Sequence, residues 1–291
     1  MGSDSPTTTA SGPLTEPQAQ ALRRLAHQIR RQILQIVYES GSGHVGAALS
    51  QADLLLALYE RYLRVDARDP ERLDRDRFVL SKGHGGLGLV PILAHRGFIS
   101  QAEIKGFGET GNALGMHLDH RRVPGVEAST GSLGHGLGVA LGMALGAQQR
   151  GIDNRTYCLL SDGECYEGST WEAALAAPAL KAGALTAIVD RNHLTMDGFT
   201  EQEVPLEPLA DKWRAFGWRV FCCDGHDFGE ICGAFDAALS AASERPAVII
   251  ATTVKGKGVP FMEQQAKWHY GALDSQMYGV ALDALSDAAR D

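Results

Sequence analysis

The chain has 291 residues, 44% apolar and 21% charged, which is enough for a large core built as one big α/β domain or two ordinary ones. Its 27 Lys and Arg against 35 Asp and Glu give a net charge of −8, which argues against nucleic acid and against a membrane surface as the main partner. Five cysteines, an odd number without a C-x-x-C pair, argue against a disulfide framework or a cysteine zinc site and favour a reducing, cytoplasmic location.

The N-terminal end differs in composition from the rest of the chain. Residues 1–16 are rich in Ser, Thr, Pro and Gly, so we expect a disordered tail without a secretory signal, followed by one domain over residues 17–291. The uncharged stretch 128–149 contains too much glycine and serine to cross a membrane. If that stretch is helical, four glycines form one stripe that favours close approach of another backbone: Gly134, Gly138, Gly142 and Gly146.

Helical and strand-like segments alternate along the domain. An amphipathic helix is expected over 18–39, ended by Ser40 and Gly41, and a second helix over 50–63 with Ser50 as its N-cap. Short apolar runs predict five strands and the segments between them two more helices: strands at 78–80, 157–160, 184–189, 218–223 and 247–253, and helices at 170–182 and 228–243. Strands separated by helices predict a doubly wound, mostly parallel sheet with helices on both faces.

Polar and glycine residues gather directly after four of these strands, at the edge where ligands bind in such sheets. Asp162 follows one strand and Asn192 follows the next, so their side chains should meet at neighbouring strand ends. Two oxygen ligands there suit Mg²⁺ or Ca²⁺, and because magnesium usually keeps phosphate ligands, a diphosphate is the expected companion. Gly163 would let the backbone approach that phosphate closely. Taken alone, the same residues are equally consistent with an Asp-Gly turn capped by Asn192.

The surrounding motifs resemble one enzyme family. A [GS]-D-G motif followed, after 28 residues here, by Asn192 is typical of the magnesium and diphosphate site of thiamine diphosphate enzymes. The stretch SDGECYEG, with Glu167 five residues after Asp162, resembles the transketolase version. Four further motifs stand in the order of a transketolase N-terminal half: SGH at 42–44, DRDRFVLSKGH at 74–84, PGVEASTGSLGHG at 124–136 and MDGFTE at 196–201. The chain is therefore similar to the N-terminal, diphosphate-binding subunit of a split transketolase.

This resemblance implies which residues hold the cofactor and its metal. The metal ligands would be the side chains of Asp162 and Asn192 and the backbone carbonyl of Leu194. Leu133 would be an apolar wedge in a tight loop under the thiazolium ring. The cofactor-binding set would come from several loops: His44, His84, Gly131, Ser132, Leu133, Asp162, Gly163, Glu164, Asn192 and His269.

The resemblance also assigns catalytic roles, to four histidines and one glutamate. His84 and His269 would donate hydrogen bonds to the diphosphate, whereas His44 and His117 would bind donor oxygens and assist proton transfer. Glu167 would lie at a subunit interface and couple to a catalytic carboxylate of the partner. A zinc site at 117–120 is disfavoured because it has no third ligand.

A partner follows from the chemistry that the resemblance implies. A transketolase moves a two-carbon ketol unit from a ketose or ketose phosphate to an aldose, and a glutamate of a pyrimidine-binding domain activates the cofactor. Only 37 residues follow Val254, too few for that domain, so we expect a separate C-terminal subunit, an α₂β₂ assembly and no activity without the partner.

Two other functions share much of this pattern. One is a thiamine diphosphate enzyme that decarboxylates a 2-oxo acid, and the other is a catalytically silent scaffold of the same fold. The HLDH sequence at 117–120 lacks the family's usual His-Pro pair, which leaves the donor sugar open. The glycines at 136, 138 and 142 do not form a dinucleotide site, because no strand precedes them and their spacing is not G-x-G-x-x-G. A P-loop nucleotide site is excluded because no G-x₄-G-K-[ST] occurs.

Overall fold

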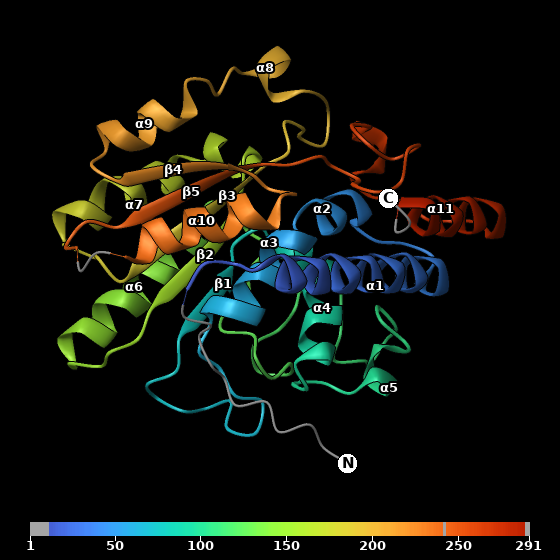
Figure 1. Ribbon diagram of the computed structural model, residues 1–291, viewed down its shortest axis with the longest axis horizontal. Coiled ribbons are helices and arrows are strands. Elements are labelled where there is room, and N and C mark those ends of the chain that lie inside the picture. Colours follow the sequence, from blue (N-terminus) through green and yellow to red (C-terminus); the bar gives the residue numbers. More distant parts are fainter. Residues whose placement is uncertain (1–11, 241–242, 289–291) are drawn as a thin grey trace.

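The computed structural model describes residues 12–240 and 243–288, built around a sheet of five parallel strands in the order β1-β2-β3-β5-β4 (Figure 1). The strands are β1 Arg77–Leu80, β2 Thr156–Ser161, β3 Leu185–Arg191, β4 Arg219–Asp224 and β5 Ala247–Thr252. All five predicted strands are present, so the doubly wound parallel sheet is confirmed. Of the predicted tail, residues 1–11 lie outside the described residues.

Side chains alternate between the two faces of the sheet and form two separate cores. In β2, Tyr157 and Leu159 belong to one core, whereas Cys158 and Leu160 belong to the other. The first core is covered by α1 Glu16–Ser40, α2 Val45–Ser50, α3 Ala52–Ala57, α4 Gly86–His95, α10 Phe228–Leu239 and α11 Ser275–Ala288. The second is covered by α6 Gly136–Gln149, α7 Gly168–Ala179 and α9 Leu209–Ala215. Both faces are thus covered, as the apolar strands predict.

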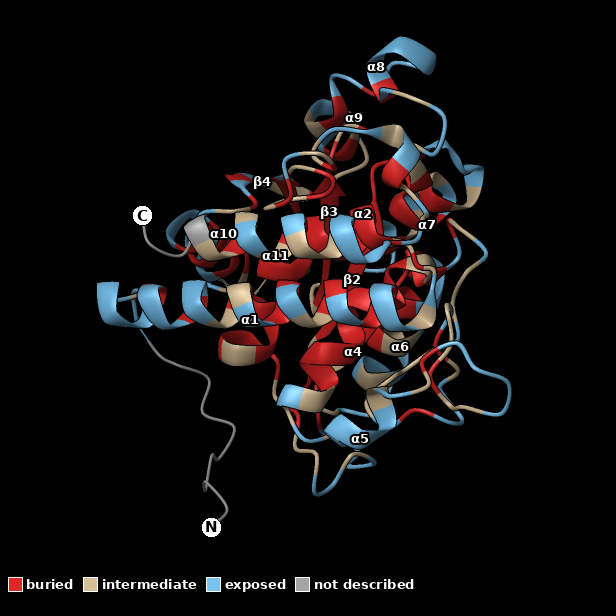
Figure 2. Ribbon diagram, turned by 90° about the vertical axis from the view of Figure 1, so that its right-hand side faces the viewer, coloured by how far each residue is buried: buried red, intermediate tan, exposed pale blue. Residues whose placement is uncertain are grey.

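The first helix, α1, follows its sequence pattern. The Gln18 side chain accepts a hydrogen bond from the Thr15 backbone N–H at 3.0 Å, which satisfies one donor before the first turn. Gly41 ends the helix at φ +71°, a conformation that glycine adopts without strain. Figure 2 shows α1 exposed along its outer face and α4 beneath it almost entirely buried. A buried ion pair between Arg30 and Asp53 at 2.6 Å ties α1 to α3.

The prediction of one helix over 50–63 capped by Ser50 is wrong. The chain forms α2, breaks at Gln51, and continues as α3 and a π-helical turn over Leu58–Tyr62. The hydroxyl of Ser50 donates to the Asp190 carboxylate at 2.6 Å, so it serves a buried carboxylate instead of a helix end. The Gln51 amide donates to the Gly85 carbonyl at 2.6 Å. These tertiary contacts to the strand-end loops decide where the helix breaks.

Two glycine-rich helices, α4 and α6, differ from what the sequence predicts. No helix was predicted at α4, because its glycines and the internal Pro91 have low helix propensity, yet the helix forms and eight of its ten residues are buried. The proposed glycine stripe lies on α6 except for Gly134, which precedes the helix at φ +82°. A Cβ at Gly138, Gly142 or Gly146 would meet open space, so no other described segment packs on this stripe. Within the described ranges, no helix is long and apolar enough to span a membrane.

Two short helices, α5 Gln101–Ile104 and α8 Thr200–Glu203, lie in the long connections. The turns at the carboxyl edge of the sheet include 3₁₀ segments at Gly83–Gly85, Gly163–Tyr166 and Ala266–Trp268. These three turns carry or adjoin residues of the predicted site.

Candidate cofactor and metal site

The two predicted metal-binding residues lie at the carboxyl ends of neighbouring strands. Asp162 directly follows β2, Asn192 directly follows β3, and Ser161 pairs with Asp190 in the register between the two strands. Both side chains are buried, with 0% and 4% of the residue exposed. The strand-end geometry expected from the sequence is therefore what the chain forms.

Asp162 is oriented by hydrogen bonds to both of its carboxylate oxygens. Oδ1 accepts from the Gly163 N–H at 2.8 Å, and Oδ2 accepts from the His193 N–H at 2.7 Å and from Arg191 Nη1 at 3.1 Å. Burial and, to a lesser extent, the nearby Asp190 carboxylate raise the pKa of this carboxyl to about 6, against the opposing effect of Arg191. This carboxylate already has one cationic partner, the Arg191 guanidinium.

The neighbouring oxygens complete a set of hard donors. The Asn192 side-chain oxygen accepts from the Leu194 N–H at 3.1 Å, and its amide nitrogen lies 3.5 Å from Asp190 Oδ2. The Leu194 carbonyl lies 3.2 Å from the ammonium of Lys255. Carboxylate, amide and carbonyl oxygens are the ligands that Mg²⁺ and Ca²⁺ take, so this donor set fits a metal of that class.

Two buried lysines, which the sequence reasoning did not select, stand beside these oxygens. Lys82 is 0% exposed and forms an ion pair with Asp190, while Lys255 is 1% exposed. The Lys255 ammonium donates to the Thr195 carbonyl at 2.7 Å and to His269 Nδ1 at 3.0 Å, and burial lowers its pKa to about 8. Both lysines lie in glycine-rich segments after strands, SKGHGG and KGKG, and that position was the signal available for finding them.

The four predicted histidines come together from four separate loops. The His44 ring centroid lies 5.3 Å from that of His84, 6.2 Å from that of His117 and 5.4 Å from that of His269. Burial is the main cause that lowers the pKa of His44 to about 4, of His84 to about 2 and of His269 to about 3, with nearby lysines lowering each further. These imidazoles are therefore neutral near pH 7. His44 Nδ1 is buried without a hydrogen-bond partner, which marks it as a polar atom available to a ligand.

The predicted loop 131–134 lies against this cluster. Gly131 has φ +150°, and a Cβ there would lie 2.9 Å from the ring of His117, so only glycine fits the close approach. Ser132 is exposed and Leu133 is half-buried. The Gly134 N–H donates to the Glu164 carboxylate at 2.9 Å, which anchors the loop to the segment after β2.

The two predicted glutamates occupy different environments. Glu164 is buried, and its carboxylate accepts from Ser81 Oγ at 2.6 Å, the Ser161 N–H at 2.9 Å and the Gly134 N–H. In this arrangement its side chain holds together three loops beside the predicted metal site. Glu167 is exposed at the start of α7, where the chain provides a surface that another subunit could reach.

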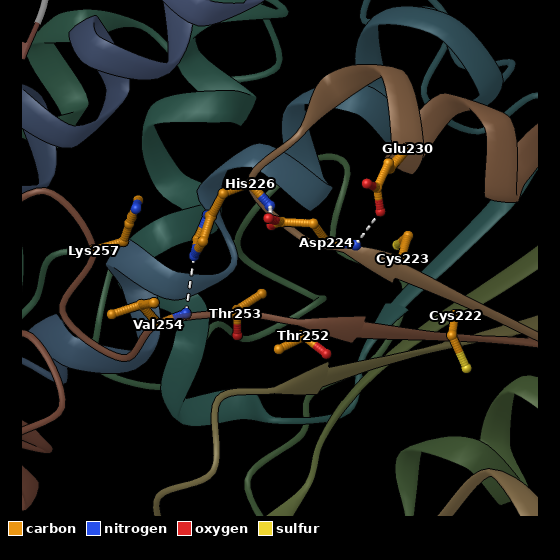
Figure 3. A pocket seen from close by; sticks show the side chains of 9 residues that line it. All are labelled: Cys222, Cys223, Asp224, His226, Glu230, Thr252, Thr253, Val254 and Lys257. Atoms are coloured by element: carbon orange, nitrogen blue, oxygen red, sulfur yellow. Dashed lines mark hydrogen bonds between the residues drawn. The ribbon is translucent and has the colours of Figure 1, made fainter.

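A pocket of about 510 Å³ lies at the carboxyl ends of β4 and β5 (Figure 3). Thr253 lines it, and the hydroxyl of that residue donates to Asp190. In Figure 3 the His226 ring points at the backbone of Val254, whose N–H donates to Nε2 at 2.9 Å, and Nδ1 lies 2.7 Å from the Asp53 carboxylate. His226 therefore fixes the backbone immediately before Lys255.

Comparison with known proteins gives the family to which this arrangement belongs. A family model described as transketolase, thiamine diphosphate binding domain, matches residues 21–281. The chain belongs to this family. It is 41% identical over 264 residues to the 6-deoxy-6-sulfo-D-fructose transketolase subunit of Clostridium sp. (strain MSTE9), a match that covers 91% of this chain and 96% of that subunit. It is 40% identical over 270 residues to one subunit of the apulose-4-phosphate transketolase of Phocaeicola vulgatus, covering 93% and 95% of the two chains.

A solved transketolase has the same fold. The structure from Campylobacter jejuni superposes with a TM-score of 0.85 at 29% identity and is matched over 94% of this chain but only 43% of its own. This chain thus spans less than half of that longer transketolase and nearly the full length of the two subunits. The expected N-terminal subunit of a split transketolase is confirmed, and the 2-oxo acid and scaffold alternatives are not favoured. The roles of individual site residues remain predictions.

Proposed function

We propose that this transketolase subunit binds thiamine diphosphate through a Mg²⁺ ion held by Asp162, Asn192 and the Leu194 carbonyl. The observation that supports this proposal is the position of these residues after the neighbouring strands β2 and β3, with the buried Lys255 in contact with the Leu194 carbonyl. Magnesium is preferred to calcium because it commonly keeps phosphate oxygens among its ligands. The two buried lysines and the Gly163 backbone would then face the diphosphate, where charge-assisted contacts are strongest.

The histidine cluster would serve both the diphosphate of the cofactor and the reacting sugar. Because His44, His84 and His269 are neutral near pH 7, each offers one ring nitrogen as a donor and one as an acceptor. We assign His84 and His269 to the diphosphate. We assign His44 and His117 to oxygens of the donor sugar, where they would assist proton transfer. Thiamine diphosphate supplies the electron sink when bound. Leu133 would exclude water beneath it, and Gly131 and Ser132 would shape the same loop.

We assign the missing half of the site to a separate C-terminal subunit. That subunit would carry the pyrimidine-binding domain and its catalytic glutamate, and two copies of each chain would form an α₂β₂ assembly. Glu167 is exposed in the single chain, consistent with a contact across that interface. The related subunits are named for 6-deoxy-6-sulfo-D-fructose and apulose-4-phosphate, so we propose a ketose or ketose phosphate as the donor and an aldose as the acceptor. The described cysteines are free, which supports a cytoplasmic location.

Reconstitution with the partner subunit tests this function. The chain alone should show no ketol transfer. Adding the co-purified C-terminal subunit with thiamine diphosphate and Mg²⁺ should produce it. The assay measures consumption of an aldose acceptor with a series of free and phosphorylated ketoses as donors. The variant His44→Ala serves as a control that should keep metal-dependent cofactor binding while losing turnover. Release of CO₂ from pyruvate by the pair, without ketol transfer, would instead support the decarboxylase alternative.

A further inference from the structure

One buried cation beside the predicted metal site, Arg191, has no role in the function proposed above. Its side chain is 2% exposed, and its guanidinium contacts the metal-binding carboxylate of Asp162 through Nη1 at 3.1 Å. The same nitrogen donates to Thr200 Oγ1 at 2.7 Å. The other two nitrogens contact Glu201 at 2.7 Å and Glu207 at 3.1 and 3.2 Å. One guanidinium is thus shared between the metal ligand and two glutamates of the segment after β3.

The buried charges around the predicted metal site are balanced without any bound ion. Among the described residues of the segments that follow β1, β2, β3 and β5, and at the last two residues of β3, three acids and three bases are buried: Asp162, Asp190, Glu164, Lys82, Lys255 and Arg191. Lys82 neutralises Asp190, and Glu164 is satisfied by neutral donors. Asp162 therefore depends on Arg191 for its charge partner. A dication that binds Asp162 alone must compete with this guanidinium and with Lys255 nearby.

The two glutamates make an exchange of partners possible. Glu201 and Glu207 have side chains 38% and 52% exposed, so they remain charged in water when Arg191 is drawn away. When a metal takes Asp162, Arg191 keeps these two carboxylates and is not left as an unpaired buried cation. An unpaired buried charge would be strongly unfavourable.

We propose that Arg191 is a positioning residue that acts as the resident counter-ion of Asp162, so that the site accepts a divalent metal only together with a diphosphate. This inference rests on the proposed function, because it assigns a second partner to the metal ligand of that site. Bare metal meets three buried cations, whereas a metal that arrives with a diphosphate brings the negative charge that those cations attract. The binding of metal and diphosphate is then positively coupled.

Calorimetric titration of the full 291-residue chain with Mn²⁺, with and without inorganic pyrophosphate, measures this coupling at mildly alkaline pH. Wild type should bind Mn²⁺ weakly alone and at least about tenfold more tightly with pyrophosphate. In Arg191→Met the affinity for Mn²⁺ alone should rise by about tenfold or more, because Asp162 loses its competing cation, and the coupling should fall. Arg191→Lys retains the charge and should restore most of the wild-type coupling.

Two further variants separate this role from a purely structural one. Glu201→Gln/Glu207→Gln leaves Asp162 as the charged partner of Arg191, so more Mn²⁺ should be needed to bind pyrophosphate. If Arg191→Met does not fold, this double variant decides the question. The control Arg64→Met removes a guanidinium paired at 2.9 Å with the buried Asp76, at the opposite edge of the sheet, and should leave the coupling unchanged.

The outcomes distinguish this inference from the proposed function. Unaltered coupling in Arg191→Met, with normal metal-dependent pyrophosphate binding in wild type, overturns the role of Arg191 alone. A wild-type chain that binds neither pyrophosphate nor thiamine diphosphate in the presence of metal overturns the proposed site itself. Tight binding of bare Mn²⁺ by wild type also contradicts the counter-ion role.

Discussion

Replacing Asp162 with Asn is expected to abolish metal-dependent binding of thiamine diphosphate. The substitution keeps the size of the side chain but removes the one carboxylate among the three proposed metal ligands, at a position that is 0% exposed and closed to compensating water. Changes in groups that only support a metal ligand commonly cost about 10–100-fold in affinity, so losing the charged ligand should cost more than about 100-fold. Calorimetric titration with thiamine diphosphate and Mg²⁺ measures the loss.

A control in the segment after β3 separates the metal site from general surface charge. Asp197 is exposed, and Asp197→Asn should leave the affinity within about twofold of wild type. If Asp162→Asn binds the cofactor as tightly as wild type, with the same dependence on Mg²⁺, then Asp162 is not a metal ligand. The Asp162→Asn variant should remain folded, because Arg191 retains the carboxylates of Glu201 and Glu207 as partners.

The second large effect is expected on stability, from Lys82→Met. Lys82 and Asp190 are both 0% exposed at the side chain and form an ion pair, with Ser50 also donating to Asp190 at 2.6 Å. Removing one partner of a buried pair leaves an uncompensated charge and should lower the free energy of unfolding by about 3–5 kcal/mol. Urea unfolding followed by circular dichroism measures this change. The variant should also weaken cofactor binding, because the diphosphate loses one of its cations.

Two companion variants test the cause of that loss. Lys82→Met/Asp190→Asn removes both charges and should recover much of the stability without recovering cofactor affinity. Lys181→Met removes an exposed lysine whose pair with Glu244 is 62% and 72% exposed, and should change stability by less than about 1 kcal/mol. A loss in Lys82→Met no greater than in Lys181→Met would show that the buried pair does not contribute as argued.

Strand positions could be predicted from the sequence because local apolar runs determine them. Placing Asp162 and Asn192 after neighbouring strands was then a consequence of parallel topology, and the pairing of β2 with β3 confirms that these strands are neighbours. The glycine at the end of α1 was also predictable, because its left-handed conformation is a local requirement. The fold class and the position of the site could therefore be predicted from local sequence patterns.

Features that depend on tertiary contacts could not be predicted in the same way. Ser50 reads as a helix cap, yet it donates to Asp190, 140 residues away. Lys82 and Lys255 read as surface lysines until the sheet places them among buried acids. Arg191 is the last residue of β3, and its local sequence gives no sign that it would contact Asp162 and two glutamates. Such contacts are set by which loops the topology brings together, and a single segment does not contain that information.

Anomalous diffraction from crystals of the chain with its partner subunit, thiamine diphosphate and Mn²⁺ tests the central claim most directly. The account predicts one manganese peak within bonding distance of the side chains of Asp162 and Asn192 and of the Leu194 carbonyl, with diphosphate oxygens completing its coordination. Two results would contradict it. One is a cofactor bound elsewhere, such as in the pocket lined by His226. The other is that, at saturating cofactor, Arg191 still pairs with Asp162 and Lys255 still contacts the Leu194 carbonyl.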